Sequence, residues 1–227
     1  MDMPILFIIP GACSLGSMVA LEWTNKPYKI GITTPEIRAS EAFRAINPTG
    51  KVAALKDGNQ VIGENLAILL SIADKYPENS MCPAINTDKR SKVYQWLSYF
   101  SASLHPAFGH ALFPTRLVAA EQAENFKIGA LERLKDVLNY IEKSFLASGF
   151  LLEDHATIVD AQAYALLRWG KGFKGGTPIV DISKYPKITH FLNLMEQQVA
   201  VKNALAIEEE HLNNLQNSQF AGYFTLA

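Results

Sequence analysis

The first apolar run of the chain, and the helical pattern that follows it, constrain the fold most. Residues Ile5 to Ile9 form a continuous apolar run closed by Pro10-Gly11, which is the pattern of a strand buried on both faces. From Ser14 onward, large apolar residues recur at helical spacing. The chain therefore begins with a buried strand that passes through a tight turn into a helix.

The alternation of strand and helix signals continues to about residue 76. We expect a second strand at 28–32, a short helix at 40–46, strands at 52–55 and 60–62 joined by Asp57-Gly58, and a helix that Pro77 ends. Residues 80–87 have the composition of a linker. Beyond it we expect no strand and helices at 88–104, 106–117, 121–147, 158–170, 186–198 and 201–215. The order βαβαββα followed by helices still leaves several folds open.

Charge and cysteine usage exclude several kinds of protein. The 227 residues carry 21 Lys and Arg against 22 Asp and Glu, and the sequence has no run of basic residues that could bind a phosphate backbone. We therefore expect no nucleic-acid partner. Cys13 and Cys82 are too few for a disulfide framework and match no zinc spacing, which favours a reducing, cytoplasmic compartment and no metal. No signal peptide is expected, because the apolar start carries no Lys or Arg before Lys26, and no apolar stretch reaches a membrane-spanning length.

Short motifs occur in a fixed order along nearly the whole chain. They are PGACSL at 10–15, NPTGKVAAL at 47–55, GENLAI at 63–68, QWL at 95–97 with LH at 104–105, and TIVDA at 157–161 with LRW at 167–169. Together they resemble the bacterial beta-class glutathione S-transferases of the cytosolic superfamily. Each motif alone is weak, and their order carries the resemblance.

The resemblance implies both a fold and a function. The fold is a two-domain α+β protein of the glutathione S-transferase type, with a thioredoxin-like N-terminal domain over 1–79 and an all-α C-terminal domain over 88–227. The function is a homodimeric, cytoplasmic detoxification enzyme that uses glutathione as co-substrate and promotes its attack on a small apolar electrophile, or thiol exchange. By the same resemblance Cys13 and His105 lie near the thiol, while Lys51, Val52, Ala53, Glu64 and Asn65 hold the peptide.

Read from the residues alone, the thiol-proximal positions keep alternatives open. Cys13 lies where a strand passes into a helix, so the helix N-terminus favours its thiolate; the alternative is a buried, inert cysteine. With glycine at position 16 no dithiol exchange is available, and a mixed disulfide with glutathione is the remaining exchange chemistry. Ser14 either donates a hydrogen bond to sulfur or caps the helix. His105 is either thiol-proximal or a packed histidine ahead of Pro106.

Glu64 and Asn65 precede an apolar helix, and two interpretations are compatible. As structural residues, Asn65 is the N-cap and Glu64 a favourable charge beside the helix dipole. As binding residues, the same helix start holds a peptide carboxylate and Glu64 takes the ammonium group. Elsewhere, Thr157 to Asp160 forms a capping box that we interpret as structural, and Trp169 is expected in the core.

Three residues depart from the family pattern around the expected site: Ala53 replaces a proline, Ser98 an asparagine and Pro106 a lysine. The family proline ordinarily makes a cis peptide, and cis bonds before other residues are rare, so we expect a trans Val52-Ala53 bond and low glutathione affinity. These departures motivate the alternative of a weakly active or inactive dimeric binding or regulatory module. A glutathione-dependent peroxidase or dehalogenase is a further alternative.

Overall fold

The computed structural model describes residues 3–226, so residues 1–2 and 227, at the outer ends of the two expected domains, lie outside it. The chain divides into two compact units. Unit 1 comprises Met1–Ala84 and Glu196–Ala227, and unit 2 comprises Ile85–Met195. The break after residue 84 falls in the expected linker, but the described part of the last segment, 196–226, groups with the first unit instead of with the helices.

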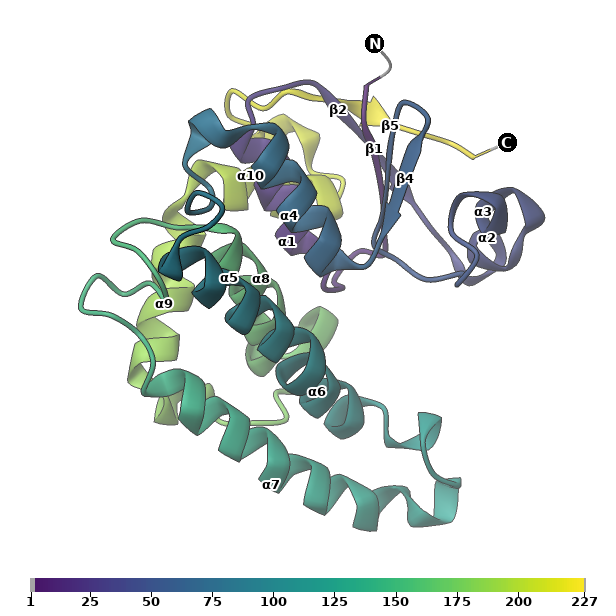
Figure 1. Cartoon of the computed structure of the whole chain (residues 1–227). Coiled ribbons are helices and arrows are strands. Elements are labelled where there is room, and N and C mark those ends of the chain that lie inside the picture. Colours follow the sequence, from purple (N-terminus) through teal and green to yellow (C-terminus); the bar gives the residue numbers. More distant parts are fainter. Residues whose placement is uncertain (1–2, 227) are drawn as a thin grey trace. The chain divides into compact units, whose positions relative to one another are not determined.

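Unit 1 is built on a five-stranded sheet in the order β4-β3-β1-β2-β5 (Figure 1). The strands are β1 (Ile5–Ile8), β2 (Tyr28–Ile32), β3 (Ala54–Asp57), β4 (Gln60–Gly63) and β5 (Phe220–Tyr223). β1 pairs in parallel with β2 and antiparallel with β3, and β3 pairs antiparallel with β4. The first four strands confirm the expected thioredoxin-like arrangement.

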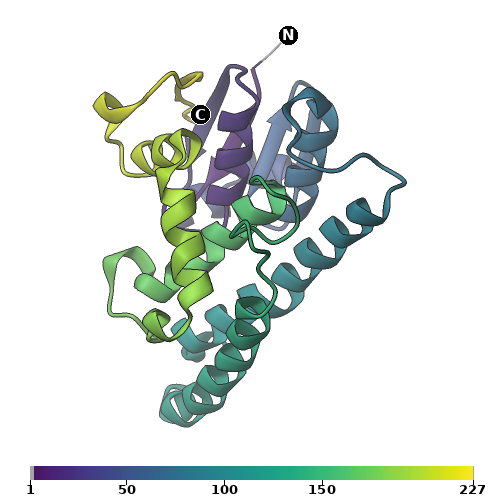
Figure 2. The same ribbon diagram turned by 90° about the vertical axis from the view of Figure 1, so that its left-hand side faces the viewer.

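Helices cover both faces of this sheet. On one face α1 (Leu15–Trp23) packs against α4 (Asn65–Lys75) and α10 (Val199–Glu208), and on the other lie α2 (Pro35–Ala39) and α3 (Glu41–Ile46) (Figures 1 and 2). The short helices begin at side-chain caps, because the hydroxyls of Thr34 and Ser40 accept hydrogen bonds from the backbone N–H groups of Ile37 and Phe43. Helix α2 is not among the helices expected from the sequence.

Strand β5 contradicts the expectation that no strand follows the linker. It pairs in parallel with β2, placing Phe220 beside Tyr28 and Tyr223 beside Ile30. The backbone N–H of Phe224 extends the pairing by donating to the carbonyl of Ile30 at 2.7 Å. The observed helix α10 ends at Glu208 and is therefore shorter at its C-terminal end than the helix expected at 201–215. A strand of four residues with its partner far away in the sequence leaves little local signal.

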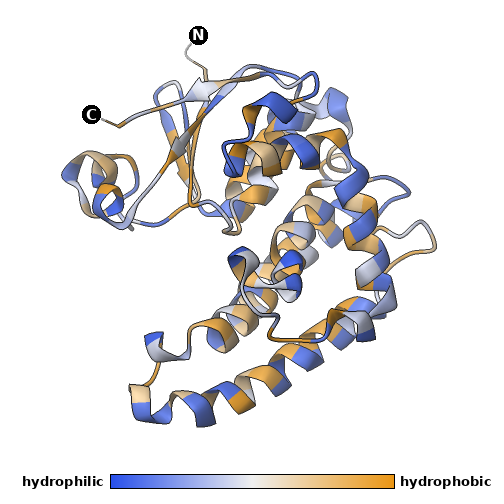
Figure 3. Cartoon of the chain, turned by 180° about the vertical axis from the view of Figure 1, so that it is seen from behind, coloured by the Kyte–Doolittle hydropathy of each residue, from blue (hydrophilic) through white to orange (hydrophobic). Residues whose placement is uncertain are grey.

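Unit 2, residues 85–195, contains helices and turns and no strand. Its helices are α5 (Asp88–Tyr99), α6 (His105–Leu112), α7 (Ala123–Glu142), α8 (Ile158–Leu167) and α9, which runs past the unit boundary (Pro186–Gln197). Phe100–Leu104 is a π-helical turn between α5 and α6. Figure 3 shows blue and orange residues alternating along α7, as expected of an amphipathic helix. Short 3₁₀ turns lie at Pro77–Asn79, Pro114–Arg116, Ala120–Gln122, Arg168–Lys171, Phe173–Gly175, Ile182–Lys184 and Leu212–Asn214.

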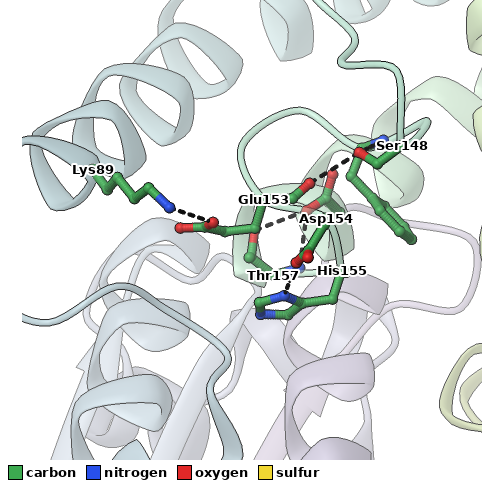
Figure 4. A network of polar contacts seen from close by, with 8 residues as sticks. Lys89, Ser148, Glu153, Asp154, His155 and Thr157 are labelled. Atoms are coloured by element: carbon green, nitrogen blue, oxygen red, sulfur yellow. Dashed lines mark hydrogen bonds and ion pairs between the residues drawn. The ribbon is translucent and has the colours of Figure 1, made fainter.

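A turn at residues 148–157 leads into α8 and is fixed by polar contacts (Figure 4). The Ser148 hydroxyl donates to the backbone carbonyl of Glu153 at 3.1 Å. The Glu153 carboxylate in turn accepts from Lys89 Nζ of α5 at 2.7 Å. The first contact connects two residues within the turn, and the second connects the turn to α5.

The capping box ahead of α8 is confirmed as a buried structural element. The fully buried Asp160 carboxylate accepts hydrogen bonds from Leu151 N at 3.0 Å, Thr157 N at 2.9 Å and Thr157 Oγ1 at 2.8 Å. Burial raises the pKa of Asp160 to about 6, so at neutral pH the carboxylate is ionised and held by these donors.

We expect Asp160→Ala to lower the free energy of unfolding by about 2 to 4 kcal/mol, because it leaves the buried N–H groups of Leu151 and Thr157 without an acceptor. Urea titration followed by tryptophan fluorescence measures the change. The matched control is Asp181→Ala, which removes an exposed carboxylate that accepts from Ser183 N and Oγ. We expect a loss of no more than about 1 kcal/mol there. Equal losses in the two variants would contradict the assigned role of Asp160.

Candidate functional site

Three segments expected to carry the site meet at one end of the sheet in unit 1. Ala54, the first residue of β3, pairs with Phe7 near the end of β1 and with Gly63 at the end of β4. Because β3 runs antiparallel to both neighbours, its start lies beside the ends of β1 and β4. The turn that carries Cys13, the Val52-Ala53 peptide and the start of α4 are therefore neighbours.

Cys13 lies in the turn that joins β1 to α1. Gly11 takes a positive φ of 82°, which glycine adopts without a Cβ clash, and Ala12 N donates to Ile9 O at 3.0 Å. Cys13 is buried, whereas Cys82 is half-buried. The Cys13 carbonyl accepts from Gly16 N at 3.3 Å, so the turn runs directly into the first turn of the helix.

Ser14 follows Cys13 and does not cap α1, which corrects the capping interpretation. Its backbone is already helical, with φ −59° and ψ −16°, whereas a capping side chain requires an extended backbone to reach the N–H groups ahead of it. The Ser14 side chain is fully buried, and its Oγ makes no hydrogen bond within the described residues 3–226. A buried hydroxyl in this state is uncommon in native proteins and calls for an explanation.

Asn65 joins the start of α4 to the Cys13 turn. Its Nδ2 donates to the carbonyl of Cys13 at 3.1 Å, and its Oδ1 accepts from Ser17 Oγ at 2.5 Å. Asn65 is the first residue of α4 and not its N-cap, so the expected capping role is wrong. Ser17 is not among the expected site residues, because a serine inside a helix carries no local sign of a partner 48 residues away.

Glu64 takes the N-cap position of α4, but its side chain makes no capping hydrogen bond. Its backbone has φ 63° and ψ 119°, a conformation that costs a non-glycine residue free energy. The side chain is exposed. Glu64 therefore presents a carboxylate to solvent at the positive end of the helix dipole.

A compact loop precedes β3 and is organised by Asn47, which the sequence analysis did not include among the site residues. The Asn47 side chain is buried; its Nδ2 donates to Lys51 O at 2.8 Å, and its Oδ1 accepts from Thr49 N at 3.3 Å. The Asn-Pro-Thr-Gly sequence was the available signal, since asparagine forms such turns with the backbone two residues ahead. Lys51 itself is exposed, Val52 half-buried and Ala53 buried.

The peptide bond between Val52 and Ala53 is cis, so the expectation of a trans bond is wrong. That expectation rested on the rarity of such bonds before residues other than proline. The expectation took no account of the surroundings of the bond. In the preceding loop Asn47 holds the Lys51 carbonyl, and Ala53 is buried at the end of the sheet.

The remaining expected site residue, His105, lies in unit 2 at the start of α6, where it is exposed. Its ring centroid lies 5.4 Å from that of Trp169. Trp169 is buried and also contacts the rings of Phe108 and Phe173, which confirms its expected place in a core. Pro106 follows the π-helical turn, and because Leu104 and His105 before it keep helical φ and ψ, it leaves one position of a continuous helical run without a backbone donor.

Within residues 3–226, no group of three or more His, Cys, Asp or Glu side chains is arranged to hold a metal ion. In the same part of the chain, no helix combines the length and apolar character that crossing a bilayer requires.

The reactivity of Cys13 stays a prediction, and the structure changes how it is best measured. Because Cys13 is buried and Cys82 half-buried, access opposes the expected electrostatic advantage of Cys13. The pH profile of iodoacetamide labelling, measured on the variants Cys82→Ser and Cys13→Ser, separates the two effects. We expect labelling of Cys13 to titrate below about pH 8, against roughly 8.5 for an ordinary thiol, because it lies ahead of a helix N-terminus. A flat rate for Cys13 from pH 5 to 9 would contradict this.

Comparison with known proteins identifies related sequences over most of the chain. The family model for the glutathione S-transferase N-terminal domain matches residues 18–80, and that for the C-terminal domain matches residues 94–199. Glutathione S-transferase GstA of Escherichia coli O157:H7 is 27% identical over 207 residues, which cover 89% of this chain and 98% of that protein.

Solved structures give the same result. A sphingomonad glutathione S-transferase complexed with glutathione is 30% identical, with a TM-score of 0.78 over 90% of this chain and 98% of that one. The beta-class enzyme of Sphingomonas chungbukensis is 29% identical, with a TM-score of 0.77 over the same shares of the two chains. The two family models together span most of the chain, and the relatives are matched over nearly their full length. The chain belongs to the glutathione S-transferase family.

Proposed function

We propose that this protein is a glutathione transferase that binds glutathione at the sheet end of unit 1 and positions its sulfur beside Cys13. The backbone at Val52 and Ala53, following Lys51, takes the cysteinyl part of the peptide. Glu64 and the start of α4 take the glutamyl end, the Glu64 carboxylate pairing with its ammonium group. The second substrate is a small apolar electrophile.

The observation that carries the proposal is the buried Ser14 hydroxyl next to Cys13. Its Oγ makes no hydrogen bond within residues 3–226, although a buried hydroxyl without a partner costs free energy. A ligand sulfur at this position supplies the missing acceptor. Hydrogen bonding to the charged form of a thiol favours the thiolate, which is the nucleophilic form.

The reaction then needs little from the protein beyond ionisation and orientation of the thiol. The glutathione thiol loses its proton to solvent, the thiolate forms a carbon–sulfur bond, and the leaving group departs with its electron pair. In thiol exchange the same thiolate attacks a disulfide and displaces the other thiolate. In exchange at the protein itself, the Cys13 thiolate attacks a disulfide that contains glutathione, forms a mixed disulfide with the glutathione half and releases the other half as a thiolate. His105 stays a proposed catalytic residue on the family resemblance alone.

Ser14→Ala separates a functional hydroxyl from a structural one. We expect kcat/KM for glutathione with an aryl halide to fall roughly ten- to hundredfold, the equivalent of one hydrogen bond to a charged group. Thermal stability should stay unchanged or rise, because the variant removes a buried group that makes no bond. Steady-state kinetics and differential scanning calorimetry measure the two effects.

The control is Ser17→Ala, which removes a hydroxyl that does have a partner, Asn65 Oδ1, and should lower stability. A loss of stability without loss of activity in Ser14→Ala would contradict the proposed role of Ser14. If the wild-type protein is neither retained on immobilised glutathione nor turns over the aryl halide, the transferase proposal fails and the alternative of a binding or regulatory module is favoured. Turnover of peroxides or reductive dehalogenation would instead favour the third alternative.

We also propose that the protein is a homodimer in a reducing, cytoplasmic compartment. Two-fold pairs are the commonest assemblies of intracellular enzymes, and the family resemblance implies one. Light scattering at micromolar concentration should report twice the monomer mass of 25.1 kDa. A mass of one chain across that range would contradict the proposed dimer.

A further inference from the structure

The 209–226 segment lies far from the expected glutathione site in sequence but is part of unit 1. Its strand β5 extends the sheet beside β2, and Tyr28 N donates to Gln219 O while Phe224 N donates to Ile30 O. Figure 2 shows this segment, in yellow, beside the purple elements of the first residues. The paired backbone fixes where the side chains that follow β5 lie.

Phe224 and Leu226 pack against an apolar cluster on the face covered by α2 and α3. The cluster has Phe7, Phe43 and Ala54 at its centre, with Ile37, Ile46 and Val52 around them; we call it the Phe7 cluster. The Phe224 ring meets the Phe7 ring edge to face, with centroids 5.9 Å apart. The Phe7 ring meets Phe43 in the same way at 5.6 Å. Gly31 makes room for Phe7, because a Cβ there would lie 2.5 Å from Phe7 Cδ1.

The Phe7 cluster also supports the loop that we assign to glutathione. Val52 and Ala54 belong to it, and they flank Ala53 in the segment proposed to take the cysteinyl part of the peptide. A side chain that fills this cluster therefore restricts where Val52 and its backbone lie. Cores close-packed in this way transmit the loss of a side chain to their neighbours.

A separate set of polar contacts holds the segment on the opposite face of the sheet. The Glu22 carboxylate accepts from Ser218 Oγ at 2.5 Å, from Asn203 Nδ2 at 2.7 Å and from the Tyr28 hydroxyl. Burial raises the pKa of Tyr28, so its hydroxyl stays protonated and remains a donor. Tyr223, the residue before Phe224, donates its hydroxyl to Ile207 O at 2.7 Å. The segment is thus anchored independently of the Phe7 cluster.

We propose that the 209–226 segment positions the glutathione-binding loop, and that Phe224 and Leu226 act on glutathione affinity through Val52. The inference rests on the proposed function. Phe224 is a positioning residue, since it packs against the Phe7 cluster beneath the loop and does not contact the reacting atoms. The Tyr223 hydroxyl anchors the same segment without contacting the loop.

The test compares Phe224→Ala, Phe224→Leu and Leu226→Ala with the control Tyr223→Phe, all in the full chain. We expect Phe224→Ala to raise KM and the calorimetric Kd for glutathione severalfold while kcat at saturating glutathione changes less than about twofold. Leu226→Ala should act in the same direction more weakly, and Phe224→Leu should recover most of the affinity. Tyr223→Phe loses one hydrogen bond, but pairing with β2 and the Ser218 contact with Glu22 still hold the segment, so the Kd for glutathione should stay unchanged.

A second measurement does not require glutathione. Hydrogen exchange of the backbone amides at residues 49–52 should speed up in Phe224→Ala, relative to amides of α4, and stay at the wild-type rate in Tyr223→Phe. If the wild type binds glutathione and the Phe224 variants alter neither Kd nor exchange, the inference is overturned while the proposed function stands. If the wild type does not bind, the proposed function fails, and exchange alone decides whether the segment positions the loop.

Discussion

The hydrogen bonds of the Asn65 side chain join the two helix starts at which the candidate site of unit 1 lies. The amide holds the Cys13 carbonyl with its nitrogen and the Ser17 hydroxyl with its oxygen. It therefore fixes the start of α4 against the turn that leads into α1. Strand pairing brings the end of β1 and the end of β4 near one another, with β3 between them, and Asn65 sets how the two helix starts meet. Strand pairing and the Asn65 contacts together place Cys13, the start of α4 and the Val52-Ala53 backbone near one another.

The sheet itself is completed by residues distant in the sequence. β2 would be an edge strand, with unpaired backbone groups, if the 209–226 segment did not pair with it. The same segment reaches both faces of the sheet: Tyr223 bonds to α10, and Phe224 enters the Phe7 cluster. Unit 1 is thus not a domain made only of the first residues of the chain. Its sheet and the Phe7 cluster include residues that follow the helical unit in the sequence.

Much of this fold could be predicted, because strands, turns and amphipathic helices leave patterns within short stretches of the sequence. The apolar run at Ile5 to Ile9 and the Asp57-Gly58 turn predict strands that the structure contains. What failed depended on distant partners or on competing local effects. Asn65 has the local pattern of an N-cap, yet its side chain bonds to residues about fifty positions away. β5 has a short, mixed sequence whose partner β2 lies near the other end of the described chain. The Val52-Ala53 bond is cis, whereas the average preference of bonds before residues other than proline predicts trans.

The central claim is that glutathione binds at the sheet end of unit 1. A crystal structure of the protein grown with glutathione tests it most directly. The account predicts the cysteinyl backbone of the peptide against Val52, its glutamyl end at Glu64 and Asn65, and its sulfur within hydrogen-bonding distance of Ser14 Oγ. Glutathione bound elsewhere, or in this place with its sulfur turned away from Ser14 and Cys13, would contradict the account.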